Sequence, residues 1–146
     1  MFTGMPEGGA IPDAGGGGRD EAAACGERAA AALGGTRFAD VRWSAATGST
    51  NADALALGRD GAPEGIVVVS DHQSAGRGRR DRTWVAPPRG SLLVSVLLRP
   101  PARVAGAASL AAAVAMVDAV ERIAGVTPGI KWPNDLLIAP SGTVRG

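Results

Sequence analysis

The segment GIVVVSDHQSAGRGRR, residues 65–80, joins a short apolar run directly to a loop rich in arginine and glycine. The run predicts a buried strand, because β-branched side chains fit the surface of a sheet. The loop alternates two residue types: Gly76, Arg77, Gly78, Arg79 and Arg80. Glycine lets a backbone approach a ligand closely, and arginine binds carboxylate or phosphate through paired hydrogen bonds. The loop therefore predicts a site for a small anion, with a solvated surface loop or a nucleic-acid contact as the alternatives.

Outward from this segment, helical and strand patterns alternate along the chain. We expect a helix over 20–33, a strand over 39–44, a helix that begins at Ser49 or Thr50 and stops at Gly61, a strand over 91–100, a helix over 103–124 and a strand–turn–strand over 129–138. The strand over 91–100 is apolar almost throughout, so we expect both of its faces to be covered. This order fits an α/β or α+β fold, and we favour α+β: a mixed β-sheet with helices packed against one face.

Length and composition indicate one domain preceded by a leader. The chain has 146 residues, which allows one domain, and its 45% hydrophobic content is sufficient for a core. Residues 1–35 are rich in glycine and alanine, and we expect a disordered leader that can include a short helix; residues 36–146 form the domain. The single cysteine, Cys25, excludes an internal disulfide and suits a reducing compartment. Without a recognisable signal peptide or membrane span, the sequence predicts a cytoplasmic protein.

Two further polar clusters flank the arginine loop in sequence. In GSTNADAL, residues 48–55, the cluster Ser49, Thr50 and Asn51 opens a helix, where it can act as a cap or can bind a small polar ligand beside free backbone N–H groups. In KWPND, residues 131–135, a proline bends the strand beside Lys131, Asn134 and Asp135. Asp135 could hold Mg²⁺, which prefers a carboxylate together with phosphate oxygens. The alternative for KWPND is a β-bulge with Asn-Asp as turn formers.

Other reactive side chains lack suitable neighbours in the sequence. His72 has no serine, cysteine or second histidine at the spacing of a catalytic triad or metal site. Cys25 has no candidate catalytic partner within the alanine-rich leader. We therefore interpret both residues as structural.

From about Trp43 to Ile138, the chain resembles the catalytic domain of the biotin protein ligases. The resemblance lies in four segments that follow one another in this order: STNADAL, VVSDHQSAGRGRRDRTW, GSLLVSVLLRP and GIKWPNDLLI. The resemblance implies the fold shared by biotin and lipoate ligases and class II synthetases, with residues 36–146 as its N-terminal part. It also implies a two-step reaction. Biotin and MgATP give biotinyl-5′-AMP, which then acylates a lysine of a biotin carboxyl carrier protein, the acetyl-CoA carboxylase subunit.

The resemblance assigns roles to the residues of the three clusters. Those implied to contact biotin are Ser49, Thr50, Asn51, Gln73, Arg77, Gly78 and Arg79. Those implied to contact the nucleotide are Arg80, Trp84, Lys131 and Asn134, with Trp84 packed beneath the loop. Arg77, Arg79 and Lys131 are implied to be catalytic, and Asp135 to bind Mg²⁺. The resemblance further implies that the loop is mobile when empty and folds over the adenylate, excluding water from it.

The sequence departs from the family pattern in three places. Asp81 stands where the family usually has glycine, and the position of a second family lysine reads GTVRG, in which Arg145 is not assigned that role. The third departure is the absence of the rest of the sheet and of a small C-terminal barrel, so we expect a fragment with little activity by itself. We also expect no DNA-binding helix-turn-helix. The alternatives are a lipoate ligase or octanoyl transferase of the same superfamily, a non-catalytic biotin-binding protein, or an arginine-rich RNA-binding module. The RNA-binding reading requires stacking aromatics, and Trp84 is the aromatic near the charge.

Overall fold

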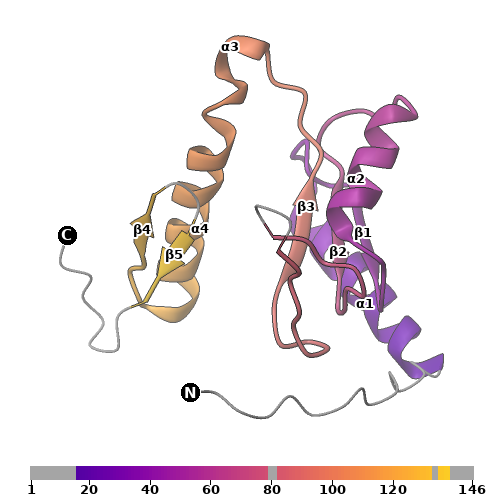
Figure 1. The fold of residues 1–146 in the computed structure, drawn as a ribbon. Helices are drawn as coiled ribbons and strands as arrows, with labels where there is room; N and C mark the ends of the chain where they lie inside the picture. Colours follow the sequence, from indigo (N-terminus) through magenta and orange to yellow (C-terminus); the bar gives the residue numbers. More distant parts are fainter. Residues whose placement is uncertain (1–15, 79–81, 133–134, 139–146) are drawn as a thin grey trace. The chain divides into compact units, whose positions relative to one another are not determined.

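The computed structural model describes residues 16–78, 82–132 and 135–138, which fall into two compact units, Met1–Leu98 and Arg99–Gly146 (Figure 1). The first unit contains a three-stranded sheet, and the second contains a two-stranded sheet. The predicted α+β class is confirmed, because each sheet is accompanied by helices of its own unit.

The helix expected within the leader is present and belongs to the first unit. Helix α1 spans Gly16–Ala32 and contacts strand β1, Val41–Ser44. Gly26 is buried, and a Cβ built on it would lie 3.2 Å from the Cβ of Trp43, so helix and strand approach closely at this glycine. The boundary expected between a leader, residues 1–35, and a domain, residues 36–146, therefore lies between two elements that pack together. The disorder expected for residues 1–15 lies outside the described residues.

Strands of the first unit form a mixed sheet in the order β1-β2-β3. Strand β2, Val67–Ser70, runs parallel to β1, and strand β3, Leu93–Val96, runs antiparallel to β2. Helix α2, Thr50–Arg59, connects β1 to β2 and contacts both β2 and β3. It ends before Gly61, whose φ of 84° is readily adopted by glycine. The prediction of a mixed sheet is thus confirmed.

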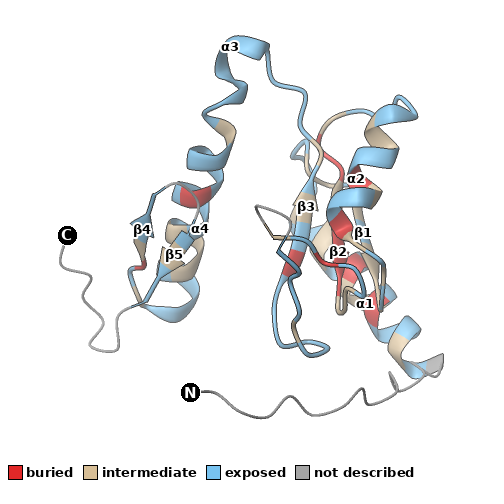
Figure 2. Ribbon diagram, in the orientation of Figure 1, coloured by how far each residue is buried: buried red, intermediate tan, exposed pale blue. Residues whose placement is uncertain are grey.

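Helices α1 and α2 cover opposite faces of this sheet. The core on the α2 side consists of buried residues and their apolar neighbours: Ala54, Ile66, Val68, Leu57, Ala62 and Leu97 (Figure 2). Val69 follows Val68 in β2 and must point to the other face, because side chains alternate along a strand. Trp43 pairs with Val69 and contacts α1 through Gly26. The expectation that helices pack against one face is therefore wrong.

Strand β3 has one covered face and one exposed face. Ser95 pairs with Val68 on the α2 side, whereas Val94 and Val96 point to the α1 side. Helix α1 contacts β1 at the far edge of the sheet, and Val94 and Val96 are 40% and 43% exposed (Figure 2). The expectation that both faces of this strand are covered is wrong for the described residues of this unit. The apolar pattern of β3 could not indicate that α1, the helix on this face of the sheet, contacts β1 instead of β3.

In the second unit, a helical segment contacts a hairpin. The helix expected over 103–124 is divided into α3, Ala102–Ala105, and α4, Ala108–Ala124. The interruption falls at Gly106, and glycine is less favourable than alanine in a helix interior. The two strands expected within 129–138 are confirmed as β4, Gly129–Lys131, paired antiparallel with β5, Asp135–Leu137, and both strands contact α4. Residues 133–134 between them lie outside the described residues.

Candidate functional site: a polar pocket beside the arginine loop

The chain after β2 returns alongside the residues that precede α2. Backbone hydrogen bonds of 2.8–3.0 Å hold the two segments together: Thr47 N to His72 O, Ser74 N to Thr47 O and Ala75 N to Gly48 O. Gln73 is thereby placed at the N-terminus of α2. Ser49 is the N-cap of this helix, and its Oγ accepts a hydrogen bond of 3.5 Å from Ala52 N. The capping interpretation of Ser49 is correct, and a cap at this position also lies in a candidate site.

A buried polar network joins α2, the returning segment and β3. The Oε1 atom of Gln73 accepts hydrogen bonds from Thr50 N at 2.7 Å and from Thr50 Oγ1 at 2.9 Å. The Oγ atoms of Thr50 and Ser95 lie 3.0 Å apart. Because the Thr50 hydroxyl donates its proton to Gln73, Ser95 must be the donor to Thr50. Thr50 is 3% exposed, so these bonds are sheltered from water.

A pocket of about 250 Å³ opens beside this network. Residues from α2, from the loop after β2 and from β3 line it: Ser49, Thr50, Asn51, Gln73, Arg77, Trp84, Ser91, Leu92, Leu93, Val94 and Ser95. The structure thus brings together residues that are widely separated in the sequence. Its lining combines hydroxyl and amide groups with apolar side chains, which suits a small ligand that has both polar and apolar parts.

The arginine loop begins and ends as a hairpin beside the pocket. Trp84 N donates to Gly76 O at 2.8 Å, and Gly78 N donates to Arg82 O at 2.6 Å. Gly76 is buried, and a Cβ on it would lie 2.6 Å from the carbonyl oxygen of Trp84, so a side chain does not fit there. Trp84 lines the pocket but is 55% exposed. The hairpin therefore fixes both ends of the loop close to the pocket.

Some of the predicted site residues cannot be placed. Arg79, Arg80 and Asn134 lie outside the described residues, as does Asp81. Arg77, Gly78 and Trp84 are the candidate residues of the loop whose positions are described, and Arg77 and Trp84 line the pocket.

The KWPND cluster lies in the second unit. Lys131 and Asp135 face each other across the β4–β5 hairpin, with Lys131 Nζ 3.9 Å from Asp135 Oδ2. Both side chains are more than half exposed. Among the residues that the structure describes, no three His, Cys, Asp or Glu side chains are grouped so that they could hold a metal ion.

The sequence analysis missed the contribution of β3 to the pocket. Ser91, Leu92, Leu93, Val94 and Ser95 line it, and Ser95 also belongs to the polar network. A signal was present, because Ser95 is a polar residue within the otherwise apolar run LLVSVLL. This serine could be interpreted as a site residue only from the antiparallel register, which places Ser95 beside Val68 on the face covered by α2.

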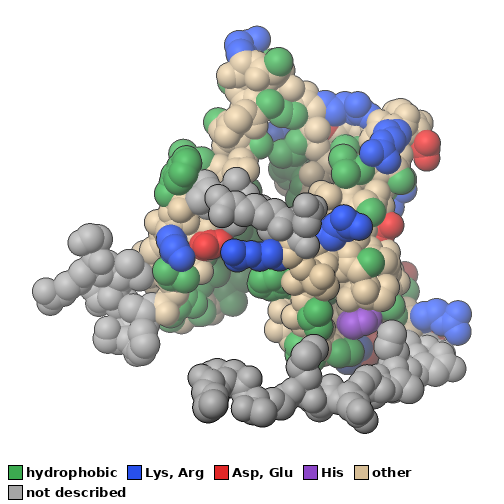
Figure 3. Space-filling model, in the orientation of Figure 1, with side chains coloured by type: hydrophobic (Ala, Val, Ile, Leu, Met, Phe, Trp, Pro, Cys, Tyr) green, Lys and Arg blue, Asp and Glu red, His purple; other side chains and the backbone are tan. Residues whose placement is uncertain are grey.

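Figure 3 shows described Lys and Arg side chains set among apolar and uncharged groups. Trp84 is the aromatic side chain described in the loop, and RNA-binding surfaces combine clustered charge with several stacking aromatics. The RNA-binding alternative would need further aromatic side chains beside Trp84.

The fold and the pocket define an α+β protein with a candidate site for a small, partly polar ligand. More particularly, the chain belongs to the biotin/lipoate A/B protein ligase family, whose sequence model matches residues 43–143. The matched segment includes every residue of the pocket and the KWPND cluster. In the described part of the chain, no helix is both long and apolar enough to cross a membrane.

Several similar proteins have names that describe them as ligases. The biotin--[acetyl-CoA-carboxylase] ligase of Mycobacterium tuberculosis (strain ATCC 25618 / H37Rv) is 45% identical over 109 residues, covering 70% of this chain and 41% of that protein. The bifunctional ligase/repressor BirA of Bacillus subtilis (strain 168) is 44% identical over 98 residues, 66% of this chain and 30% of that protein. A biotin--[acetyl-CoA-carboxylase] ligase of Paracoccus denitrificans is 43% identical over 106 residues, 70% of this chain and 43% of that protein. The chain thus spans less than half the length of these relatives.

Proposed function

We propose that this chain binds and activates biotin as part of a biotin protein ligase. In the first step, a carboxylate oxygen of biotin attacks the α-phosphorus of ATP. A new P–O bond forms, the bond to the β-phosphate breaks, and pyrophosphate leaves. In the second step, the ε-amino group of a lysine on a biotin carboxyl carrier protein attacks the acyl carbon of biotinyl-5′-AMP. An amide forms, and AMP and a proton are released.

The observation that carries this proposal is the polar network of Thr50, Gln73 and Ser95 beside the pocket. The ureido ring of biotin presents N–H donors and a carbonyl acceptor, whereas the dithiolane ring of lipoate and the chain of octanoate present neither. The network leaves the exposed Asn51 and Ser91 as further polar groups of the lining. An apolar head group would bind poorly beside them, because these groups would lose water without gaining partners. The pocket therefore favours biotin over lipoate or octanoate.

The arginine loop suits the activation step for an electrostatic reason. The carboxylate of biotin and the α-phosphate of ATP repel each other, and fixed guanidinium groups offset that repulsion and stabilise the charge that develops on phosphorus. We assign Arg77, which lines the pocket, as one such group. We assign Arg79 to the same role, Gly78 to close approach over biotin and its adenylate, and Arg80 and Trp84 to the nucleotide. Closure of this loop would keep water from the mixed anhydride.

We assign Lys131, Asn134 and Asp135 to the nucleotide side of the reaction. Lys131 provides a positive charge for phosphate oxygens. Mg²⁺ fits Asp135 as one ligand, because this ion commonly takes one or two carboxylates and completes its shell with water and phosphate oxygens. The ion would neutralise phosphate charge and assist the departure of pyrophosphate.

Ligand binding by the chain itself is the first test. We expect isothermal titration calorimetry to detect biotin binding, with lipoate at least about tenfold weaker, because a site built for hydrogen bonding discriminates strongly against an analogue that lacks the polar group. Ser95→Ala should weaken biotin binding, whereas Thr36→Val, which removes a hydroxyl in the turn after α1 that does not line the pocket, should leave it unchanged. Equal affinity for biotin and lipoate would reject the assignment of substrate.

Catalysis can be tested by exchanging the matched segment. A chimera of the Mycobacterium tuberculosis ligase that carries residues 43–143 of this chain should form biotinyl-5′-AMP from biotin and MgATP, detectable by mass spectrometry. Arg77→Ala in the chimera should lower the rate, because it removes a charge that stabilises the transition state. A folded chimera that binds biotin but forms no adenylate would contradict the catalytic part of the proposal and leave the binding part intact.

A further inference from the structure

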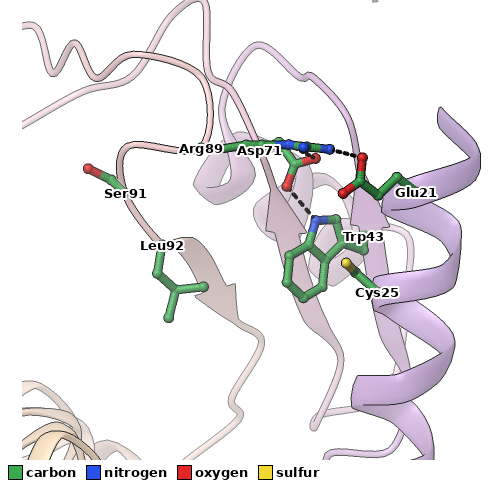
Figure 4. Close-up of a pocket in the computed structure, with 7 residues that line it drawn as sticks. All are labelled: Glu21, Cys25, Trp43, Asp71, Arg89, Ser91 and Leu92. Carbon is green, nitrogen blue, oxygen red and sulfur yellow. Dashed lines mark hydrogen bonds and ion pairs between the residues drawn. The ribbon is translucent and has the colours of Figure 1, made fainter. Parts of the chain in front are cut away.

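A second cavity adjoins the candidate biotin pocket. It measures about 350 Å³ and is lined by residues of α1, β1 and the segments that flank β2 and β3: Glu21, Cys25, Trp43, Asp71, Arg89, Ser91 and Leu92 (Figure 4). Ser91 and Leu92 also line the candidate pocket. The segment that follows Arg89 is therefore a wall shared by two cavities, and whatever fixes this segment also fixes one side of the biotin pocket.

The backbone at Arg89 adopts a conformation that usually favours glycine. Arg89 has a φ of 59°, and among the described residues it is the non-glycine residue with positive φ. It is the third residue of a turn closed by a 2.9 Å hydrogen bond from Gly90 N to Pro87 O. A positive φ at the third position of such a turn is accommodated most easily by glycine. An arginine held in this conformation points to a role for its side chain.

The side chain of Arg89 reaches two carboxylates from different elements. Its Nη2 donates a short hydrogen bond to Glu21 Oε2 on α1, and its Nε lies 3.8 Å from Asp71 Oδ2 at the end of β2 (Figure 4). The backbone N of Arg89 donates to Asp71 O at 2.9 Å. The other carboxylate oxygen of Asp71 accepts a 2.9 Å hydrogen bond from the indole of Trp43. One arginine thus ties together α1, β1, the end of β2 and the turn before β3.

These contacts distinguish the role of Arg89 from the role proposed for the arginines of the loop. Its guanidinium is paired with two acids, so its charge is already compensated and is not directed at a ligand anion. Asp71 lies two residues before Gln73, and Arg89 lies two residues before Ser91, and both Gln73 and Ser91 line the candidate pocket. The contact between Asp71 and Arg89 therefore joins the two chain segments just before each of them reaches the pocket. The hydrogen bond and charge of Arg89 lower the pKa of the Glu21 carboxyl.

We propose that Arg89 is a positioning residue that uses helix α1 to hold the wall of the biotin pocket in place. The assignment of the ligand rests on the proposed function; the attachment of the wall does not. Helix α1 then contributes to ligand binding although it lies outside the segment matched by the family model and lends no residue to the pocket itself.

The test uses variants that separate the charge of Arg89 from its backbone. Arg89→Gln keeps a side chain in the positive-φ turn and loses both ion pairs, Glu21→Gln loses the pair with α1 alone, and the double variant combines them. Arg42→Gln is the matched control. It removes an exposed ion pair, in which Arg42 Nη2 lies 3.0 Å from Asp40 Oδ2, and neither residue lines either cavity. Hydrogen exchange of the ligand-free chain, resolved by peptide mass spectrometry, then reports on the backbone amides of residues 91–95.

We expect faster exchange at residues 91–95 in Arg89→Gln and Glu21→Gln, with the double variant no faster than Arg89→Gln, because Glu21 acts through Arg89. Arg42→Gln should leave these amides unchanged. The dissociation constant for biotin should rise about two- to fivefold, the effect that an exposed ion pair can produce, and Arg89→Lys should retain part of the affinity because it keeps the charge. Added salt should narrow the difference between wild type and Arg89→Gln, since ions screen the pair.

Each outcome decides a different claim. Unchanged exchange at residues 91–95 in Arg89→Gln would overturn the attachment of the wall. Faster exchange with unchanged biotin affinity would overturn the role of that attachment in binding. A wild-type chain that binds no biotin would reject the proposed function, and hydrogen exchange would still support or overturn the contact between Arg89 and the wall.

Discussion

The hydroxyl of Thr50 shows how much one buried side chain can determine at this site. It donates to Gln73 Oε1, accepts from Ser95, and is almost fully shielded from solvent. Thr50→Val keeps the shape of the side chain but leaves Ser95 without this acceptor, which should cost about 1–3 kcal/mol of unfolding free energy. Urea unfolding followed by tryptophan fluorescence measures the loss. Ser74→Ala, which removes an exposed hydroxyl with a 3.4 Å hydrogen bond, should cost much less, and an equal loss would contradict the network.

Two glycines of the arginine loop should respond differently to substitution by alanine. A Cβ at Gly76 would lie 2.6 Å from the backbone oxygen of Trp84, whereas a Cβ at Gly78 would have its nearest neighbour, the Cβ of Arg82, at 3.4 Å. Gly76→Ala must therefore displace the hairpin that begins the loop, at a cost of about 1–3 kcal/mol. Gly78→Ala should leave the unfolding free energy unchanged or slightly raised, because alanine restricts the unfolded chain. Urea unfolding of both variants checks this, and equal stabilities would refute the close approach.

At the scale of elements, the contact between α1 and the turn before β3 predicts a dependence of stability on pH. Bonding to Arg89 lowers the pKa of Glu21 from its ordinary value of 4.5. A carboxyl with a lowered pKa stabilises the folded state fully above its unfolded pKa, and this contribution is lost as the pH falls through the folded pKa. The pKa of Asp40 is lowered in the same way by its hydrogen bond to Arg42, so both contributions disappear in acid.

The measurement compares wild type with Glu21→Gln. The difference between their urea midpoints should be constant near neutral pH. It should start to shrink near the ordinary pKa of 4.5 and approach zero once the pH has fallen through the lowered pKa of folded Glu21, below which Glu21 of the wild type is neutral as well. Glu27→Gln, an exposed change on the same helix, is the control. A difference that persists unchanged in acid would show that the Glu21 carboxylate does not stabilise α1 through its charge.

Elements with strong local signals were predictable from the sequence. Helix α2 was expected from its cap and its stop, and both Ser49 and Gly61 have those roles. The strand β2 was expected from its β-branched run. The break at Gly106 was not expected, because the apolar spacing continues through it and a single glycine shifts the helical preference by only about 1 kcal/mol.

The faces covered by the helices could not be predicted, because they depend on contacts between distant segments. A run such as LLVSVLL is equally consistent with a strand covered on both faces and with a strand covered on one. The same limit applies to the pocket. Ser49, Thr50, Asn51 and Gln73 were expected as binding residues and do line it together with Arg77, but the contribution of Ser95 required the register of β3. The roles of these residues in binding stay predictions.

At the scale of the whole molecule, exposed apolar surface is the feature that should govern behaviour in solution. In the first unit, Leu92, Val94, Val96 and Leu98 are each at least 40% exposed, and alternation along β3 directs them to one face. Contiguous apolar surface of this kind promotes association between molecules. The chain should therefore bind hydrophobic dyes and scatter light at concentrations at which a protein with a covered sheet does not.

A substitution on this face should remove much of that behaviour without weakening the fold. Val96 is 43% exposed and does not line the candidate pocket, so Val96→Lys places a charge in solvent and leaves the pocket residues unaltered. We expect less binding of the dye anilinonaphthalene sulfonate and less light scattering, with a change in unfolding free energy within about 0.5 kcal/mol. Val68→Thr is the contrasting variant: Val68 is 6% exposed in the core, and an added hydroxyl there should lower stability and increase dye binding. If Val96→Lys destabilised the fold as much as Val68→Thr does, the outer face of β3 would be a buried surface in solution, because only burial makes a charge at that position so costly.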